Sequence, residues 1–117
     1  MNAIRVNDLD RDAALNGAID LLGDRWILLV VSHALYHGAT RFKDFEQQLN
    51  IPSNMLAARL RRLTAVGVIE RHPSRLGRSP HEYRLTDLGA ALEPALQAFA
   101  DWAELKDRGK DMREGHT

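Results

Sequence analysis

Seven arginines lie within residues 51–85, and their positive charge is the strongest chemical signal in the sequence. This segment contains only two glutamates and carries a net charge of +5, whereas residues 1–50 carry −2 and residues 86–117 carry −3. The 117-residue chain as a whole is therefore neutral. Guanidinium groups bind phosphates and the edges of bases, so a concentrated basic segment inside a neutral chain indicates a surface for nucleic acid.

A helix predicted over residues 53–66 is expected to present part of this charge to DNA. Its apolar positions recur at helical spacing and are Leu56, Leu60 and Leu63. The opposite face then begins with small side chains, Ser53 among them, which allow close approach to base edges. Asparagine pairs with adenine, arginine with guanine, and an apolar side chain touches a thymine methyl. The predicted groove-contacting residues are Asn54, Met55 and Arg59.

Phosphate contacts are predicted on either side of these groove contacts. Arg62 lies one turn further along the same helix and is expected to reach phosphate. Arg41 and Lys43 begin the preceding short helix, where side chains and backbone N–H groups together bind phosphate. The alternative is that these arginines only form a solvent-exposed helix face. No acidic residues lie four positions away to form ion pairs with them, which weakens this alternative. Arg61 is assigned to the flank of the helix and left out of the predicted set.

Two short strands, expected over residues 68–72 and 82–85, enclose a basic loop at residues 74–80. Arg75 and Arg78 on this loop are predicted to contact the DNA backbone or the minor groove. The alternative is a plain surface hairpin in which these arginines serve only solubility.

Hydrophobic periodicity predicts a mainly α fold with one small β-hairpin. Apart from the helix at residues 53–66, the expected helices cover residues 8–22, 25–36 and 42–49, and a long final helix begins near residue 86. Pro94 should kink that last helix or lie close to its first turns. The second helix is apolar almost all round, which places it at the centre of the core. The third and fourth helices are joined by only a short turn and must therefore cross, as in a helix-turn-helix.

One domain is predicted over residues 1–105, followed by a charged tail at residues 106–117 that is either a frayed helix end or disordered. The helix boundaries come from local signals. The predicted N-caps are Asp24, Thr40, Ser53 and Thr86, and the predicted stops are Gly23, Gly38 and Gly67.

Composition excludes several classes of protein. The chain has no cysteine, which excludes disulfides, zinc–thiolate sites and thiol redox chemistry. No signal peptide is visible, and the longest apolar run is too short to span a bilayer, so a cytoplasmic location is expected. His33 and His37 are spaced four residues apart but lack a third ligand nearby, so a structural role is favoured over metal binding. No acid–base or nucleophilic set is present, which predicts a protein that is not an enzyme and needs no cofactor.

Four aromatic residues suggest a small-molecule pocket between the first, second and last helices. They are Trp26, Tyr36, Phe99 and Trp102. Aromatic residues on apolar stripes more often belong to a core or to a dimer interface.

Several segments resemble, in one register, the HxlR-type winged-helix transcriptional regulators of bacteria. The matching segments are residues 18–26, 41–45, 51–63, 66–71, 82–86 and 94–102, together with Gly89. The resemblance extends over roughly residues 13–103. It implies a homodimer that pairs through its first and last helices and binds double-stranded DNA at a pseudo-palindromic operator. We expect a repressor rather than an activator. The alternative is a winged-helix module that binds another protein and has lost DNA binding.

The chain departs from this family pattern at one position. Many members that sense electrophiles carry a Cys-Pro pair where this sequence has Ala13 and Ala14. Thiol sensing is therefore excluded, and any switch must depend on a small ligand, on another protein or simply on the abundance of the protein itself.

Overall fold

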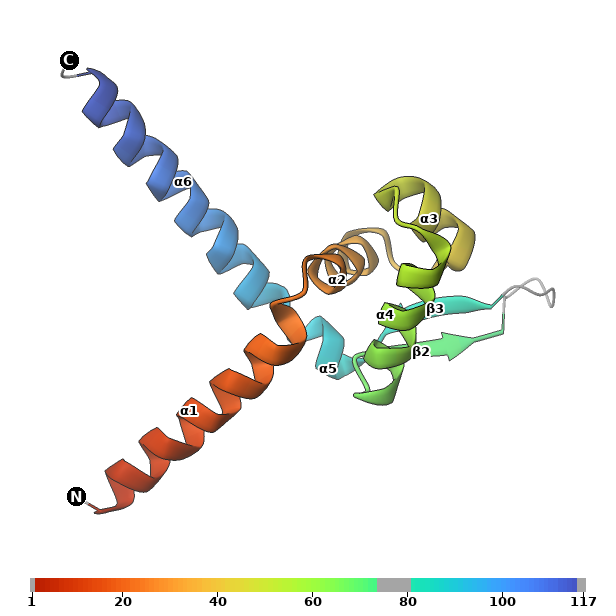
Figure 1. Ribbon diagram of the computed structural model, residues 1–117, viewed down its shortest axis with the longest axis horizontal. Coiled ribbons are helices and arrows are strands. Elements are labelled where there is room, and N and C mark those ends of the chain that lie inside the picture. The colour runs from red at the N-terminus through yellow and green to blue at the C-terminus, as the bar shows by residue number, and fades with distance from the viewer. Residues whose placement is uncertain (1, 74–80, 116–117) are drawn as a thin grey trace.

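The computed structural model describes residues 2–73 and 81–115, and side chains within 10–73 and 81–110. Its helices are α1 (Asn2–Leu22), α2 (Arg25–His37), α3 (Phe42–Leu49), α4 (Ser53–Ala65), α5 (Asp87–Ala90) and α6 (Glu93–Gly115). Its strands are β1 (Thr40–Arg41), β2 (Ile69–His72) and β3 (Glu82–Leu85). The predicted mainly α fold with a β-hairpin is confirmed (Figure 1).

The sheet contains a strand that the sequence pattern did not predict. Its three strands are antiparallel in the order β1-β3-β2. In the added strand, Thr40 pairs with Tyr83 and Arg41 pairs with Glu82. Two residues are too few to show the alternation by which a strand is recognised, so β1 exists only because β3 offers it a free edge.

The core is built around α2, as its apolar sequence predicts. Ile27, Val30 and Val31 are fully buried on this helix. The leucine stripe of α4 packs against it, with Leu56 and Leu63 at 0% exposure and Leu60 at 2%. Phe45 of α3 and Ile69 of β2 complete the same cluster. The helices α2 to α5 and the sheet, called the body from here on, therefore share one hydrophobic core.

Two of the four predicted N-caps are confirmed. Asp24 caps α2, and its Oδ1 accepts hydrogen bonds from the backbone N–H groups of Trp26 at 2.9 Å and Ile27 at 3.2 Å. The Thr86 hydroxyl accepts from the N–H of Gly89 at 3.1 Å. This cap belongs to the short α5, because the chain turns at Ala91 before α6 begins. The single long helix predicted from residue 86 is therefore wrong, and Pro94 lies in the first turn of α6, where its missing N–H costs nothing.

The other two predicted caps are wrong. Thr40 lies in β1, where its hydroxyl donates to the carbonyl of Gly38 at 2.9 Å, and Arg41 occupies the N-cap position of α3. Pro52 occupies the N-cap position of α4. Ser53 is already helical, and its hydroxyl donates to the carboxylate of Glu46 on α3. Both predictions failed because each helix begins one residue away from the expected position, so that Thr40 precedes the N-cap of α3 and Ser53 follows that of α4.

Backbone conformation at two turns shapes the helix-turn-helix. Asn50 is left-handed, with a φ of 52°, and its conformation turns the chain from α3 towards α4. Gly67 has a φ of 80°, as expected of the residue that ends α4. The turn at Asn50 is short, so α3 and α4 cross and pack against α2. One side of α4 is left facing outward.

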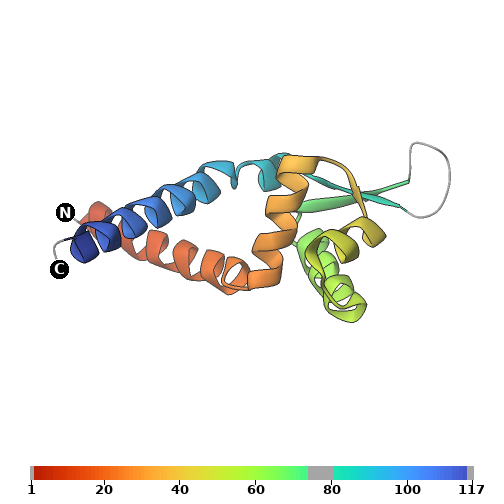
Figure 2. The same ribbon diagram turned by 90° about the horizontal axis from the view of Figure 1, so that it is seen from above.

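Two helices project from the body and are called the arms. Figure 1 shows α1 and α6 diverging from it, and Figure 2 shows that they leave on the same side. The radius of gyration is 18.1 Å, whereas a compact domain of this length has about 13 Å. α6 continues without a break past Lys106 to Gly115. Within the described residues, no helix is both long and apolar enough to cross a membrane.

Candidate nucleic-acid interface

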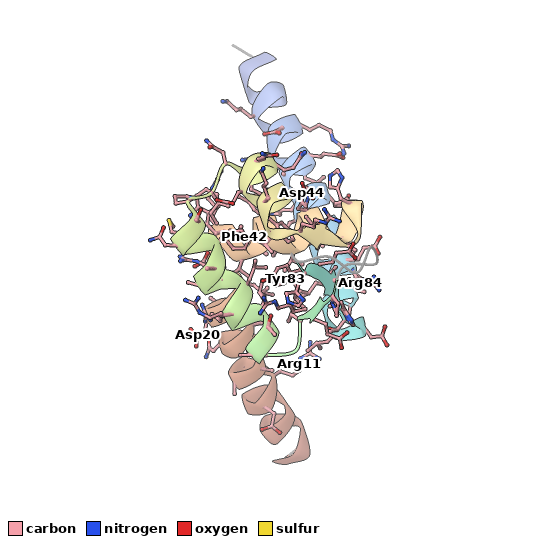
Figure 3. All side chains as sticks on the ribbon, turned by 90° about the vertical axis from the view of Figure 1, so that its right-hand side faces the viewer. Arg11, Asp20, Phe42, Asp44, Tyr83 and Arg84 are labelled. Carbon is pink, nitrogen blue, oxygen red and sulfur yellow. The ribbon has the colours of Figure 1, made fainter. Side chains whose placement is uncertain are left out.

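The outward side of α4 carries polar and basic side chains. Its leucine stripe faces the core, and Figure 3 shows the helix lying across the face of the molecule beside the sheet. Among the predicted groove contacts, Asn54 is exposed at the start of the helix. Met55 is half-buried and packs against the core cluster. The structure therefore offers Asn54 to a ligand more openly than Met55.

Arg59 forms an ion pair with a residue distant in sequence. Its Nη2 lies 3.0 Å from Oδ2 of Asp24, and its Nε donates to the same oxygen at 3.2 Å. No acidic residue lies four positions from Arg59 on α4, as the sequence indicates, but spacing within one helix does not reveal a carboxylate on another element. The side chains are only 28% and 21% exposed. Arg59 therefore links α4 to the junction between α1 and α2.

The electrostatics of Asp24 agree with this link. Burial by itself raises the pKa of Asp24. The hydrogen bond from Arg59, the N–H groups of Ile27 and Trp26, and the positive charge of Arg59 lower the pKa by a larger amount. The net result is a pKa below the ordinary aspartate value. One carboxylate thus caps α2 and holds α4 at the same time.

Arg62 makes a second bond to the same junction. Its Nη2 donates to the backbone carbonyl oxygen of Asp20 at 2.8 Å. This carbonyl lies in the last turn of α1, where unpaired carbonyls attract a cation. Arg62 remains exposed, so its guanidinium has further donors for a phosphate.

Arg61, which was predicted to lie on the flank of the helix, is an exposed arginine of α4. At 3.6 residues per turn it lies about 130° from the centre of the leucine stripe, whereas Arg59 lies about 70° from it. Arg61 is exposed, and no residue in the described parts of the chain bonds to its side chain. A helical-wheel calculation on the three leucines alone would have ranked Arg61 ahead of Arg59.

Two of the remaining predicted phosphate contacts lie at the start of α3, which packs against α4. Lys43 is exposed in the first turn of α3, and Arg41 is half-buried at the N-cap of that helix. Arg75 and Arg78 lie outside the described residues. At the base of the hairpin, Arg84 is held by Glu82 at 3.3 Å, whereas Arg71 is exposed and forms no ion pair with the described residues.

The four aromatic residues proposed to line a ligand pocket are not brought into one cavity. Phe99 lines an apolar hollow of about 320 Å³ between α1 and α6, which Trp26, Tyr36 and Trp102 do not line. The Tyr36 hydroxyl accepts a hydrogen bond from Gln97 at 3.1 Å. Trp102 is 63% exposed, with Lys106 over its ring at 5.7 Å.

The histidine pair of α2 makes a ring contact. The centroids of His33 and His37 lie 4.3 Å apart in a stacked arrangement, and His33 also contacts Phe45. The described part of the chain holds no group of three residues able to bind a metal ion.

Large apolar side chains are exposed along both arms. They are Leu15, Ile19, Phe99, Trp102 and Leu105, each between 56% and 63% exposed. Monomeric proteins rarely leave a continuous apolar stripe of this kind in water. The arms therefore offer a surface on which another protein surface can pack.

A crossed α3–α4 pair, a following β-hairpin and an outward arginine-bearing helix define a winged helix-turn-helix protein. Residues 21–110 match the sequence profile of the HxlR-like helix-turn-helix family, which is most of the chain. The protein therefore belongs to the HxlR family, and the resemblance noted in the sequence is confirmed.

Relatives in this family are named as transcriptional regulators. An uncharacterized HTH-type transcriptional regulator of Mycobacterium tuberculosis is 38% identical over 87 residues, covering 74% of this chain and 54% of the relative. The chain thus spans about half the length of this relative. The HTH-type transcriptional regulator YodB of Bacillus subtilis is 36% identical over 93 residues, covering 77% of this chain and 80% of YodB. The reduced form of YodB has a TM-score of 0.70 at 34% identity, covering 78% of this chain and 89% of that structure.

Proposed function

We propose that this protein is a sequence-specific, double-stranded DNA-binding transcriptional regulator that acts as a homodimeric repressor. The observation that carries the proposal is the outward side of α4, where Asn54, Arg61 and Arg62 stand exposed on a helix supported from behind by the core. A helix of this kind enters the major groove, and its asparagine and arginine side chains recognise base edges and phosphates.

The proposed contacts divide by position on the body. Asn54 and Arg61 come first for the major groove, with Ser53 beside them at the start of α4. Arg41, Lys43 and Arg62 are assigned to phosphates, and Arg75 and Arg78 of the wing loop to the backbone or minor groove. Met55 and Arg59 remain secondary candidates, because one packs on the core and the other would have to leave Asp24.

Homodimerisation is supported by the apolar arms. A second copy that packs α1 and α6 against their equivalents would cover the stripe that contains Ile19, Phe99 and Trp102. A twofold dimer presents two α4 helices to successive major grooves, about 34 Å apart, which requires a pseudo-palindromic operator. A dimer seated there would keep other proteins off that DNA, which is the basis for proposing repression.

Salt-dependent DNA binding tests this proposal. Fluorescence anisotropy would compare the DNA upstream of the protein's own gene with a random duplex of equal length, over a range of salt concentrations. We expect much tighter, salt-steep binding to the upstream DNA, since each phosphate contact adds roughly one unit to the salt slope. Equal and weak binding to both duplexes would contradict a sequence-specific regulator.

Two arginine variants would locate the interface. Arg61→Ala should cost about 1–3 kcal/mol on the preferred site, while Arg59→Ala should cost less there and act mainly on stability. Arg25→Ala, at an exposed position on α2, is the matched control. The opposite order, with Arg59→Ala losing specificity and Arg61→Ala unchanged, would restore the orientation first predicted from the sequence.

A further inference from the structure

A cavity of about 550 Å³ lies between α4 and the sheet. Its apolar walls come from Phe42, Leu60, Tyr83 and two alanines of α4, and its charged groups are Arg61 and Arg71. Figure 3 shows Tyr83 between α4 and β3, with Phe42 near it. This volume falls within the range of small-molecule sites, which is about 300–1,000 Å³.

The geometry of the two elements explains why the cavity exists. Arg71 and Tyr83 are directly paired across the β2–β3 ladder, so their side chains share one face of the sheet. Ile69, two residues before Arg71, is buried on that same face beneath α4. Ala57 and Ala65 lie on the side of α4 that turns towards this face. Small side chains there leave the sheet only partly covered, and the gap remains open.

The charges in the cavity are unbalanced. None of its lining residues is acidic. In the described parts of the chain, Arg61 and Arg71 form no ion pair, whereas Arg59 is held by Asp24 and Arg84 by Glu82. An arginine from α4 and an arginine from β2 line this otherwise largely apolar cavity, and this combination is complementary to an anion that carries a flat apolar body. A phosphate group by itself would leave the aromatic and aliphatic walls unused.

We propose that this cavity binds a small aromatic carboxylate, with the carboxylate between Arg61 and Arg71 and the ring against Phe42 and Tyr83. This site is distinct from the hollow at Phe99, and it supplies an effector chemistry that needs no cysteine.

Binding there would also oppose DNA, a consequence that rests on the proposed function. Arg61 belongs both to the cavity and to the exposed face of α4. A carboxylate that engages Arg61 and Arg71 neutralises charge that would otherwise meet phosphates, so the ligand and DNA bind with reciprocal antagonism.

The first experiment uses protein without DNA. Isothermal titration with 1-naphthoate should give saturable binding with one ligand per chain, and the neutral 1-naphthamide should bind roughly tenfold or more weakly, because a lost charge-assisted hydrogen bond costs about that factor. Arg61→Gln and Arg71→Gln should each weaken naphthoate binding to a similar extent. Arg25→Gln, outside the cavity, should leave it unchanged. Naphthoate that fails to bind, or that binds the Arg61→Gln/Arg71→Gln double variant as tightly as the wild type, overturns the proposal.

A second variant separates loss of charge from loss of space. Ala57→Leu keeps both arginines and fills the cavity, so it should abolish naphthoate binding while thermal melting shows a folded protein. Unchanged binding to this variant would place the ligand elsewhere and overturn the site.

Competition with DNA then tests the linkage. Naphthoate should lower the affinity of the wild type for its DNA, and should have no such effect on Ala57→Leu.

Naphthoate that binds without changing DNA affinity upholds the site and overturns the antagonism. A protein that binds naphthoate but no DNA upholds the site while the proposed function fails. Arginine variants that weaken only DNA binding, with no naphthoate bound to the wild type, would assign the cavity to the DNA backbone and overturn the proposal.

Discussion

The body and the arms of this protein contain similar apolar residues and bury them to very different degrees. In the body, Phe45, Leu56 and Leu63 are completely buried. On the arms, Phe99 is 58% exposed and Leu105 is 62% exposed. Residue type therefore does not distinguish the two regions. The body packs its buried residues against one another within residues 25–90, with Leu21, Leu22 and Leu96 from the roots of the arms against the same core. The rest of the arms diverge from each other.

The difference shows which apolar side chains one chain buries by itself and which ones need another surface to bury them. In the described residues, Asp24 caps α2 and also pairs with Arg59 of α4. A second polar link joins Arg62 of α4 to the carbonyl of Asp20 at the root of α1. The arms leave apolar area exposed to water, and the free energy falls only when another surface covers this area. Stability of the body and association through the arms should therefore respond to different substitutions.

The largest expected effect is a core truncation in the body. Leu56→Ala should lower the free energy of unfolding by about 3 kcal/mol, because it leaves a cavity in a packed interior. Urea denaturation followed by circular dichroism measures this. Leu105→Ala on the arm is the matched control and should cost less than about 1 kcal/mol when the chain is dilute. Equal losses for the two variants would contradict the contrast between body and arms.

Next in size is a charge placed on the arm. Phe99→Glu should weaken self-association by about 2 kcal/mol or more, roughly thirtyfold, because a carboxylate replaces an aromatic side chain that the proposed dimer would bury. Sedimentation velocity over a range of concentrations measures the change. Gln97→Glu adds the same charge on the other side of α6 and should leave association intact. A Phe99→Glu protein that associates like the wild type would show that the arms meet through another surface.

A smaller effect is expected at the junction of the two regions. Asp24→Ala removes both a helix cap and an ion pair, and should cost about 1–2 kcal/mol. A double-mutant cycle with Arg59→Ala isolates the pair and should give a coupling of about 1 kcal/mol or less, since the pair is partly exposed to solvent. Strictly additive losses in thermal or urea unfolding would mean that the ion pair contributes nothing to holding α4.

The smallest effect is a dependence on pH within the body. Burial, and then the neighbouring His37, lower the pKa of His33 below its ordinary value, and Asp44 opposes this only in part. Between the two pKa values the unfolded chain binds more protons than the folded chain, so the free energy of unfolding falls as the pH falls. The contribution of His33 to stability is therefore complete above the ordinary pKa of histidine and is lost as the pH falls through the lowered pKa of the folded state. Urea midpoints at pH 7.5 and pH 5 should show a smaller difference in His33→Gln than in the wild type. An identical difference would assign the pH dependence to other groups.

Sequence patterns predicted the elements that depend on local periodicity. The leucine stripe of α4, the central position of α2 and the cap at Asp24 are all confirmed. Each depends on residues within a few positions of one another. The same patterns missed β1, which pairs with a strand about forty residues away, and they merged α5 with α6 because both are helical in composition.

The candidate interface was predicted less completely than the fold. Its location on α4 follows from the concentration of arginines, which is visible in the sequence alone. The surroundings of individual arginines could not be predicted, because Arg59 bonds to Asp24 across 35 positions and Arg61 lines a cavity that the sheet helps to form. Guanidinium groups are chemically alike, so their roles depend on the partners that the fold brings near.

Local properties of this chain are enough to define its class: helical periodicity, turn residues and the clustering of charge predict a winged helix-turn-helix whose fourth helix is rich in arginine. Three features required the folded molecule: the ion pair that holds α4, the cavity beneath Arg61 and Arg71, and the exposed apolar stripes of the arms. The physical reason is the separation along the chain of the residues that interact. Periodicity and capping act between neighbours in the chain, whereas ion pairing, cavity shape and exposure depend on contacts between residues far apart in sequence.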